Sequence, residues 1–128
     1  MKSKKFYFNI IILSLLFFIP LFGISQVFKH SHKGEKITHN NYTLSYSENN
    51  EQAEWVYYIL NKEKLKGITK RTNNFKSDDK VTTGSAHPSN YKHSGFDRGH
   101  LAPASDMKIS RTTMSESFLM TNISPQNP

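Results

Sequence analysis

Cysteine is absent from the 128-residue sequence, which excludes disulfide-stabilised scaffolds and zinc sites built on thiolates. Histidine occurs six times, but no pair has the i, i+4 spacing with an intervening glutamate that is typical of a zinc metalloprotease helix. Acidic residues are scarce, with 10 Asp and Glu against 17 Lys and Arg, so the formal net charge is +7. This excess suits a polyanionic partner, and it equally suits an ordinary soluble basic surface.

Residues 1–25 have the three regions of a secretory signal peptide. Lysines precede an apolar run at Ile10–Ile19, and Gly23–Ser25 offers small residues at the cleavage spacing. An uncleaved membrane anchor is the alternative, which the shortness of the apolar run disfavours. We therefore expect residues 26–40 to form a polar linker and residues 41–128 a folded domain. Export would place that domain in the periplasm or the medium, without stable membrane association after cleavage.

The first part of the domain has the patterns of β-strands. Tyr42–Tyr46 alternates apolar and polar residues, which predicts a half-buried strand. Trp55–Leu60 is dense in aromatic and β-branched residues, which favours a buried strand. A helix over Glu51–Leu65 is the alternative, since Gly67 could end it.

The second part of the domain has the patterns of a short helix and a further strand. Ser110 is a suitable N-cap for a short helix within Asp106–Ser117. Phe118–Ile123 predicts a strand that pairs with the one carrying Asp97–Leu101.

Two other polar groups indicate solvated surface rather than a metal site. His30, His32 and His39 lie on a polar arm with little periodicity. Asp78 and Asp79 are adjacent carboxylates in a stretch that we interpret as a solvated loop.

One short stretch concentrates the side chains that can carry chemistry, because Asp97, Arg98 and His100 surround Gly99 within four positions. A guanidinium has the planar fork that binds phosphate oxygens. An imidazole titrates near neutrality, so it can take a proton from water, and glycine allows the backbone to approach a ligand closely. The stretch therefore suits hydrolysis of a phosphodiester; a charged turn with an internal Asp–Arg pair is the alternative.

This stretch resembles the Asp-Arg-Gly-His signature of the DNA/RNA non-specific endonucleases, the ββα-metal family of secreted bacterial nucleases and mitochondrial endonuclease G. The similarity runs from about Tyr42 to Gln126. It rests on further blocks in the same order and spacing: Thr83-Gly84-Ser85, Ser94-Gly95-Phe96, Leu101-Ala102-Pro103-Ala104 and Ser117 to Gln126. The paired blocks around His100 and Asn122 indicate the family more specifically than one tetrapeptide would.

The resemblance implies an α+β fold, with an antiparallel sheet core and a ββα-metal motif. Residues 41–128 would be the N-terminal part of such a domain, cut before the metal-binding helix. The implied cofactor is Mg²⁺, with Mn²⁺ as the alternative, held by an asparagine beyond Pro128. Asn127 follows Gln126 too closely to be that asparagine, so we assign no metal ligand in this chain.

The candidate site residues follow from these two lines of reasoning. His100 suits a general base, and Arg98 suits a contact with phosphoryl oxygens. The resemblance adds Asn122 as a polar partner of the hydrated metal or the histidine, and Arg71 as a second phosphate contact. Asp97 is expected to support the arginine or the backbone, and Gly99 is a supporting residue that lets the backbone bend or approach a ligand closely.

Two functional hypotheses follow. The first is a secreted, Mg²⁺-dependent endonuclease that hydrolyses DNA and RNA without sequence specificity. The second is a catalytically incomplete fragment or a basic module that binds nucleic acid without cleaving it, and its binding would weaken with salt.

Overall fold

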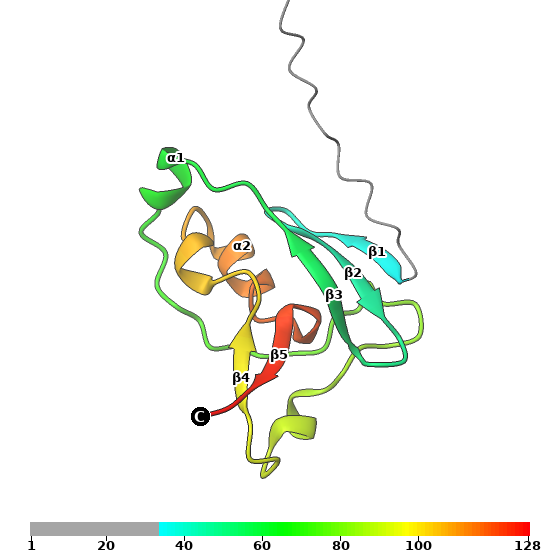
Figure 1. Ribbon diagram of the computed structural model, residues 1–128. Coiled ribbons are helices and arrows are strands. Elements are labelled where there is room, and N and C mark those ends of the chain that lie inside the picture. Colours follow the sequence, from blue (N-terminus) through cyan, green and yellow to red (C-terminus); the bar gives the residue numbers. More distant parts are fainter. Residues whose placement is uncertain (1–33) are drawn as a thin grey trace, which may run out of the picture. The chain divides into compact units, whose positions relative to one another are not determined.

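The computed structural model describes residues 34–128, and the expected signal peptide lies outside this range. Five strands form two antiparallel sheets (Figure 1). The larger sheet has the order β1-β2-β3, and the smaller pairs β4 with β5. The strands are β1 (Glu35–Thr38), β2 (Thr43–Ser47), β3 (Gln52–Tyr57), β4 (Asp97–His100) and β5 (Ile123–Gln126).

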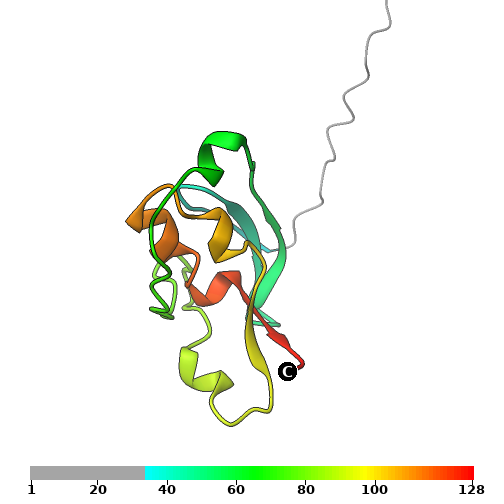
Figure 2. The same ribbon diagram turned by 90° about the vertical axis from the view of Figure 1, so that its left-hand side faces the viewer.

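Short helices complete the described residues and lie beside the sheets in both views (Figures 1 and 2). The α-helices are α1 (Lys62–Leu65) and α2 (Arg111–Glu116). Single 3₁₀ turns are η1 (Pro88–Tyr91), η2 (Ala104–Asp106) and η3 (Met120–Asn122). Within residues 34–128, no helix has the length and apolar character needed to cross a membrane.

The central strand β2 is buried more completely than its alternation predicts. Leu44 and Tyr46 face the main apolar core, as expected of one face of a strand. Ser45 points to the opposite face, yet it is also buried, and its hydroxyl donates to Glu54 Oε2 at 3.0 Å. The predicted strand is confirmed, but it is covered on both faces.

The described part of the expected linker belongs to the folded domain. β1 pairs with β2 from Glu35↔Tyr46 to Thr38↔Thr43, and Ile37 enters the apolar core. His39 follows directly and is only 6 % exposed. This stretch was expected to be a linker because of its polar composition, but it contains the short edge strand β1.

The strand predicted at Trp55–Leu60 begins earlier and ends earlier, as β3. Val56 and Tyr58 pack against the core, but Tyr57, Ile59 and Leu60 are exposed. The expected burial of the whole aromatic run is therefore wrong. A helix over Glu51–Leu65 is also wrong, because helical structure in this stretch is limited to α1, which Asn61 caps by accepting from Lys64 N at 2.9 Å.

The last strand pairs with β4 as predicted, but it lies closer to the C-terminus than predicted. The register aligns His100 with Ile123 and Asp97 with Gln126. Phe118–Asn122, which we expected to be strand, instead contains an isolated bridge between Leu119 and Lys76 and then the η3 turn. The mixed α/β architecture with antiparallel sheets is the predicted fold class.

Candidate active site

The strand that carries the candidate residues is fixed at both ends. Before β4, Gly95 adopts φ +83°, a conformation that glycine tolerates best. After β4, Leu101 N donates to Asn122 O at 2.9 Å. The Asn122 side chain then holds the next residue, because its Oδ1 accepts from Ala102 N at 2.8 Å and its Nδ2 donates to Ala102 O at 2.9 Å.

The amide of Asn122 has no free donor for a ligand. Its Nδ2 makes a second bond, to Ser117 O at 2.9 Å, so both of its N–H groups donate to backbone carbonyls. The residue is fully buried. Asn122 therefore lies on the neighbouring segment, as the resemblance implies, but its contacts are with the backbone that positions His100.

The exposed side chain of Gln126 occupies the space that a Cβ at position 99 would fill. A Cβ built at this position would lie 1.9 Å from Cδ of Gln126 and 2.2 Å from its Nε2. The side chain of Gln126 thus crosses β4 at Gly99. An alanine at position 99 would therefore require this flexible side chain to move.

His100 lies in a cluster of three rings. Its ring centre is 4.8 Å from that of Phe118 and 5.7 Å from that of Phe75, both in edge-to-face geometry. Phe75 and Phe118 also contact each other edge to face at 4.9 Å. Such arrangements favour the positive ring edge against the negative ring face, so the imidazole orientation is set by packing.

Two guanidinium groups cover this aromatic cluster. Cζ of Arg98 lies 4.3 Å from the centre of the Phe75 ring, and Cζ of Arg71 lies 4.8 Å from the centre of the Phe118 ring. Both contacts are cation–π interactions, which are worth roughly 0.5–1 kcal/mol each at exposed sites. The structure therefore brings Arg71, Arg98 and His100 together, although Arg71 is distant in sequence.

The surroundings of His100 keep its imidazole neutral. Burial, and to a smaller extent the positive charge of Arg71, together lower the pKa of His100 to about 4. Nε2 is buried and has no hydrogen-bond partner among residues 34–128. At neutral pH the ring can therefore accept a proton rather than donate one.

The expected support of the arginine by Asp97 is not present. The Asp97 side chain is exposed and makes no hydrogen bond or ion pair with another described residue. Phe75 supports Arg98 instead. In the sequence, Phe75 follows two cations closely, and this spacing was the signal available, although the same pattern is common on ordinary surfaces.

A buried polar network near the site contradicts the expectation of solvated His39 and Asp78. His39 Nε2 lies 2.8 Å from Asp78 Oδ2, and Thr121 Oγ1 donates to the same oxygen at 2.7 Å. Burial alone would raise the pKa of Asp78, but hydrogen bonds from His39, Thr121 and Lys80 N lower it instead. The network ties the end of β1 to the residue before Asn122.

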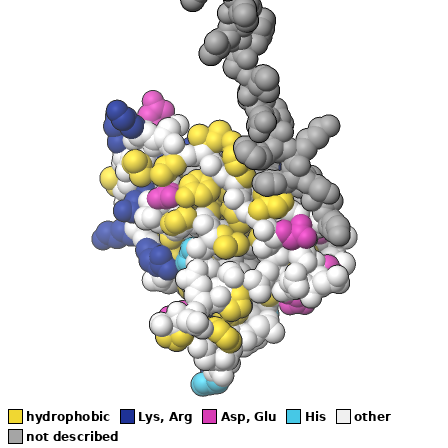
Figure 3. Space-filling view, in the orientation of Figure 1, with side chains coloured by type: hydrophobic (Ala, Val, Ile, Leu, Met, Phe, Trp, Pro, Cys, Tyr) yellow, Lys and Arg dark blue, Asp and Glu magenta, His cyan; other side chains and the backbone are white. Residues whose placement is uncertain are grey.

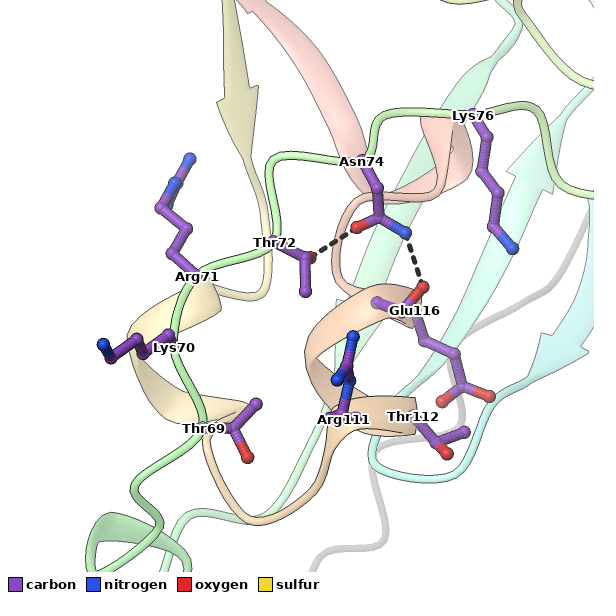
Figure 4. Close-up of a pocket in the computed structure, with 10 residues that line it drawn as sticks. Thr69, Lys70, Arg71, Thr72, Asn74, Lys76, Arg111, Thr112 and Glu116 are labelled. Carbon is purple, nitrogen blue, oxygen red and sulfur yellow. Dashed lines mark hydrogen bonds between the residues drawn. The ribbon is translucent and has the colours of Figure 1, made fainter.

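A polar groove of about 1030 Å³ lies next to the ring cluster around His100, between the segment Thr69–Lys76 and α2 (Figure 4). Arg71 lines the groove and also covers Phe118, so the groove and the ring cluster share a side chain. In the space-filling view, Lys and Arg side chains gather along the left-hand edge of this face (Figure 3).

The described residues do not by themselves fit a complete metal centre. No three His, Cys, Asp or Glu side chains in residues 34–128 are grouped closely enough to hold an ion. The side-chain amide of Asn122 is hydrogen-bonded to backbone groups of Ala102 and Ser117. The chemistry that this part of the chain supplies is that of a neutral imidazole and two guanidinium groups.

The fold and this arrangement are those expected of the ββα-metal class, with β4 and β5 as its two strands. A solved structure described as an EndoG/EndoGI complex matches with a TM-score of 0.67 and 27% identity, over 74% of this chain and 40% of that one. The family model for DNA/RNA non-specific endonuclease matches residues 23–128. The chain belongs to the DNA/RNA non-specific endonuclease family.

Curated relatives agree with this assignment. A nuclease from Nostoc sp. is 41% identical over 91 residues, which cover 70% of this chain and 33% of that protein. Human mitochondrial endonuclease G is 38% identical over 89 residues, covering 68% of this chain and 30% of that protein. The chain thus spans about a third of the length of these relatives.

Proposed function

We propose that the protein hydrolyses phosphodiester bonds of DNA and RNA without sequence specificity, with His100 as the general base. The observation that carries the proposal is a neutral imidazole flanked by two guanidinium groups at the end of β4. Family membership supports the reaction class. Contacts to phosphate and sugar carry no sequence information, which is consistent with a broad substrate range.

In the proposed reaction, His100 takes the proton from the attacking water. Because Nε2 is buried, Nδ1 is the nitrogen that we assign to this step. The negative charge that spreads over the phosphoryl oxygens is met by Arg98 and Arg71, whose exposed guanidinium groups are held on aromatic rings. Asn122 acts as a positioning residue, through Ala102 and Leu101.

The cofactor that we propose is Mg²⁺, with Mn²⁺ as a substitute. Such an ion, when bound, would stabilise charge on the phosphate and on the leaving oxygen. The proposal rests on membership of the family, because residues 34–128 contain no group of three or more His, Cys, Asp or Glu side chains that could hold an ion. Chelation with EDTA should abolish cleavage and Mg²⁺ should restore it; cleavage that persists in EDTA would contradict the proposal.

We also propose that the protein acts outside the cytoplasm, as a secreted or periplasmic enzyme. The support is the signal-peptide pattern of residues 1–25, which lie outside the described residues. Fractionation of expressing cells tests this proposal. Recovery of full-length protein with an intact N-terminus from the cytoplasm would contradict it.

The direct test of the function is plasmid nicking and RNA degradation by the full-length protein and by its His100→Ala variant. General-base catalysis typically contributes about 10²–10⁴-fold, so the variant should lose activity by that factor. His93→Asn is the matched control, because His93 is exposed at φ +62°, which asparagine tolerates. Binding of nucleic acid without cleavage by the wild-type protein would favour the non-catalytic module instead.

A further inference from the structure

The groove beside the ring cluster is larger and more basic than one phosphate requires. Its volume of about 1030 Å³ reaches the upper end of the range for small-molecule pockets. Every residue that lines it is polar or charged. Four of these side chains are cations, namely Lys70, Arg71, Lys76 and Arg111, and Figure 4 shows them on both walls.

Three of these cations have no assigned task within the protein. Lys70, Lys76 and Arg111 are exposed, and none of their side chains makes a hydrogen bond or ion pair with another described residue. Cations that line one groove repel each other, and an anion bound among them would reduce that repulsion. The arrangement therefore indicates an anionic ligand.

The single acid that lines the groove is engaged elsewhere. Both carboxylate oxygens of Glu116 accept hydrogen bonds from Asn40, Oε2 from its backbone N at 3.0 Å and Oε1 from its Nδ2 at 2.6 Å. Its one negative charge is outnumbered by the four cations, so the residues that line the groove keep a net formal charge of 4 − 1 = +3.

The floor of the groove is held by neutral hydrogen bonds. Thr72 Oγ1 donates to Asn74 Oδ1, and Asn74 Nδ2 donates to Ser115 Oγ at 2.6 Å. The first bond lies within the Thr69–Lys76 segment, and the second joins this segment to α2 (Figure 4). A preformed site loses less conformational entropy when a ligand binds.

Resting on the function proposed above, we propose that Lys70, Lys76 and Arg111 bind the phosphates that flank the scissile one on the same nucleic-acid strand. Arg71 connects the two regions, because it lines the groove and also lies over Phe118 beside His100. Lys and Arg with hydroxyl and amide groups are the donors that usually contact a phosphate backbone. The absence of apolar lining residues disfavours a protein partner, which would need a buried apolar anchor.

Binding is measured in EDTA, so that no cleavage occurs, by anisotropy of a labelled single-stranded oligonucleotide of about 16 nucleotides, the upper end of known site sizes. The test variant is Lys70→Glu/Arg111→Glu in the full-length protein. The control is Lys36→Glu/Lys92→Glu, which changes two exposed lysines outside the groove by the same charge. A milder variant, Lys76→Gln, and thermal unfolding of all proteins guard against loss of the fold.

The groove variant should bind at least about tenfold more weakly, since charged contacts to phosphate are each worth on the order of 1 kcal/mol or more. Its slope of log Kobs against log salt should fall by about 1.4, because each lost phosphate contact on a single strand contributes about 0.7. The control variant should keep both values. With Mg²⁺ present, the groove variant should still hydrolyse bis(p-nitrophenyl) phosphate, which has one phosphate and cannot reach the groove from His100.

Equal affinity and an equal salt slope for the groove variant and the wild type would overturn the inference, whether or not the wild type cleaves. Equally tight, groove-dependent binding of a polyglutamate peptide would also overturn it. If the groove variant loses binding and the wild type cleaves no substrate with Mg²⁺, the groove assignment stands and the proposed hydrolysis fails. The two proposals can therefore be separated in one set of experiments.

Discussion

Replacing Asn122 by alanine should lower the stability of the protein, because the Asn122 side chain contacts backbone groups and has no free donor for a ligand. The substitution removes three side-chain hydrogen bonds in a fully buried position and leaves Ala102 N, Ala102 O and Ser117 O without those partners. Each buried polar group left unsatisfied costs about 1–3 kcal/mol, so the unfolding free energy should fall by about 3 kcal/mol or more. Urea unfolding of the full-length protein measures this loss from the midpoint at constant m.

The control for this measurement is Asn50→Ala, at an exposed position whose side chain makes no hydrogen bond to another described residue. Its effect should stay within about 0.5 kcal/mol. The reasoning would be refuted if Asn122→Ala unfolded at the wild-type midpoint while losing activity, because Asn122 would then act on the metal or substrate directly. Equal loss of stability in both variants would also contradict it.

Three further predictions concern residues around the site. Gly99→Ala should destabilise the protein by about 1 kcal/mol or less, because the exposed side chain of Gln126 can move away from the new Cβ, and Gln126→Ala in the same chain should remove the effect in urea unfolding. Asp78→Ala should lower the unfolding free energy by about 3 kcal/mol or more, since it leaves His39 and Thr121 unpaired in a buried network. Asp79→Ala, at the exposed neighbouring position, should leave the unfolding free energy nearly unchanged. Equal losses in the two variants would contradict the stabilising role of the network. The pKa of His100 is about 4 in the folded protein and near 6.5 in the unfolded protein. Because the unfolded state binds the proton first as the pH drops, the unfolding free energy should fall between pH 6.5 and pH 4. If His100→Ala kept the same dependence of unfolding free energy on pH, other groups would be responsible for it.

Local signals in the sequence predicted the elements whose stability is local. Ser110 was expected to cap a short helix, and it accepts from Thr113 N at 3.1 Å at the start of α2. The alternation at Tyr42–Tyr46 predicted β2. In each case the determining atoms lie within a few positions of one another, so the pattern carries the information.

The features that sequence reasoning missed depend on contacts between distant segments. His39 and Asp78 were expected in solvent, but they are 39 positions apart and bury each other. Phe118–Asn122 has strand composition, yet its bonds to Lys76 and Ala102 hold it in a bridge and a turn. Tertiary contacts override local propensity in such segments.

The candidate site also has a part that could be predicted from local sequence and a part that depends on contacts between distant segments. The Asp-Arg-Gly-His stretch and the block around Asn122 pointed to His100 and Arg98 without a structure. The aromatic pair that orients them, Phe75 and Phe118, comes from two other segments and could not be paired from spacing alone. The pKa of the histidine depends on its burial and on the charge of Arg71, which comes from another segment.

The most direct test of this account is an NMR titration of the His100 imidazole in the full-length protein, assigned by comparison with His100→Ala. We expect a pKa of about 4, and we expect it to rise in Arg71→Ala, because removal of the neighbouring positive charge favours the protonated ring. A pKa at or above the ordinary value of about 6.5 would contradict the neutral, partly buried base on which the proposed hydrolysis depends.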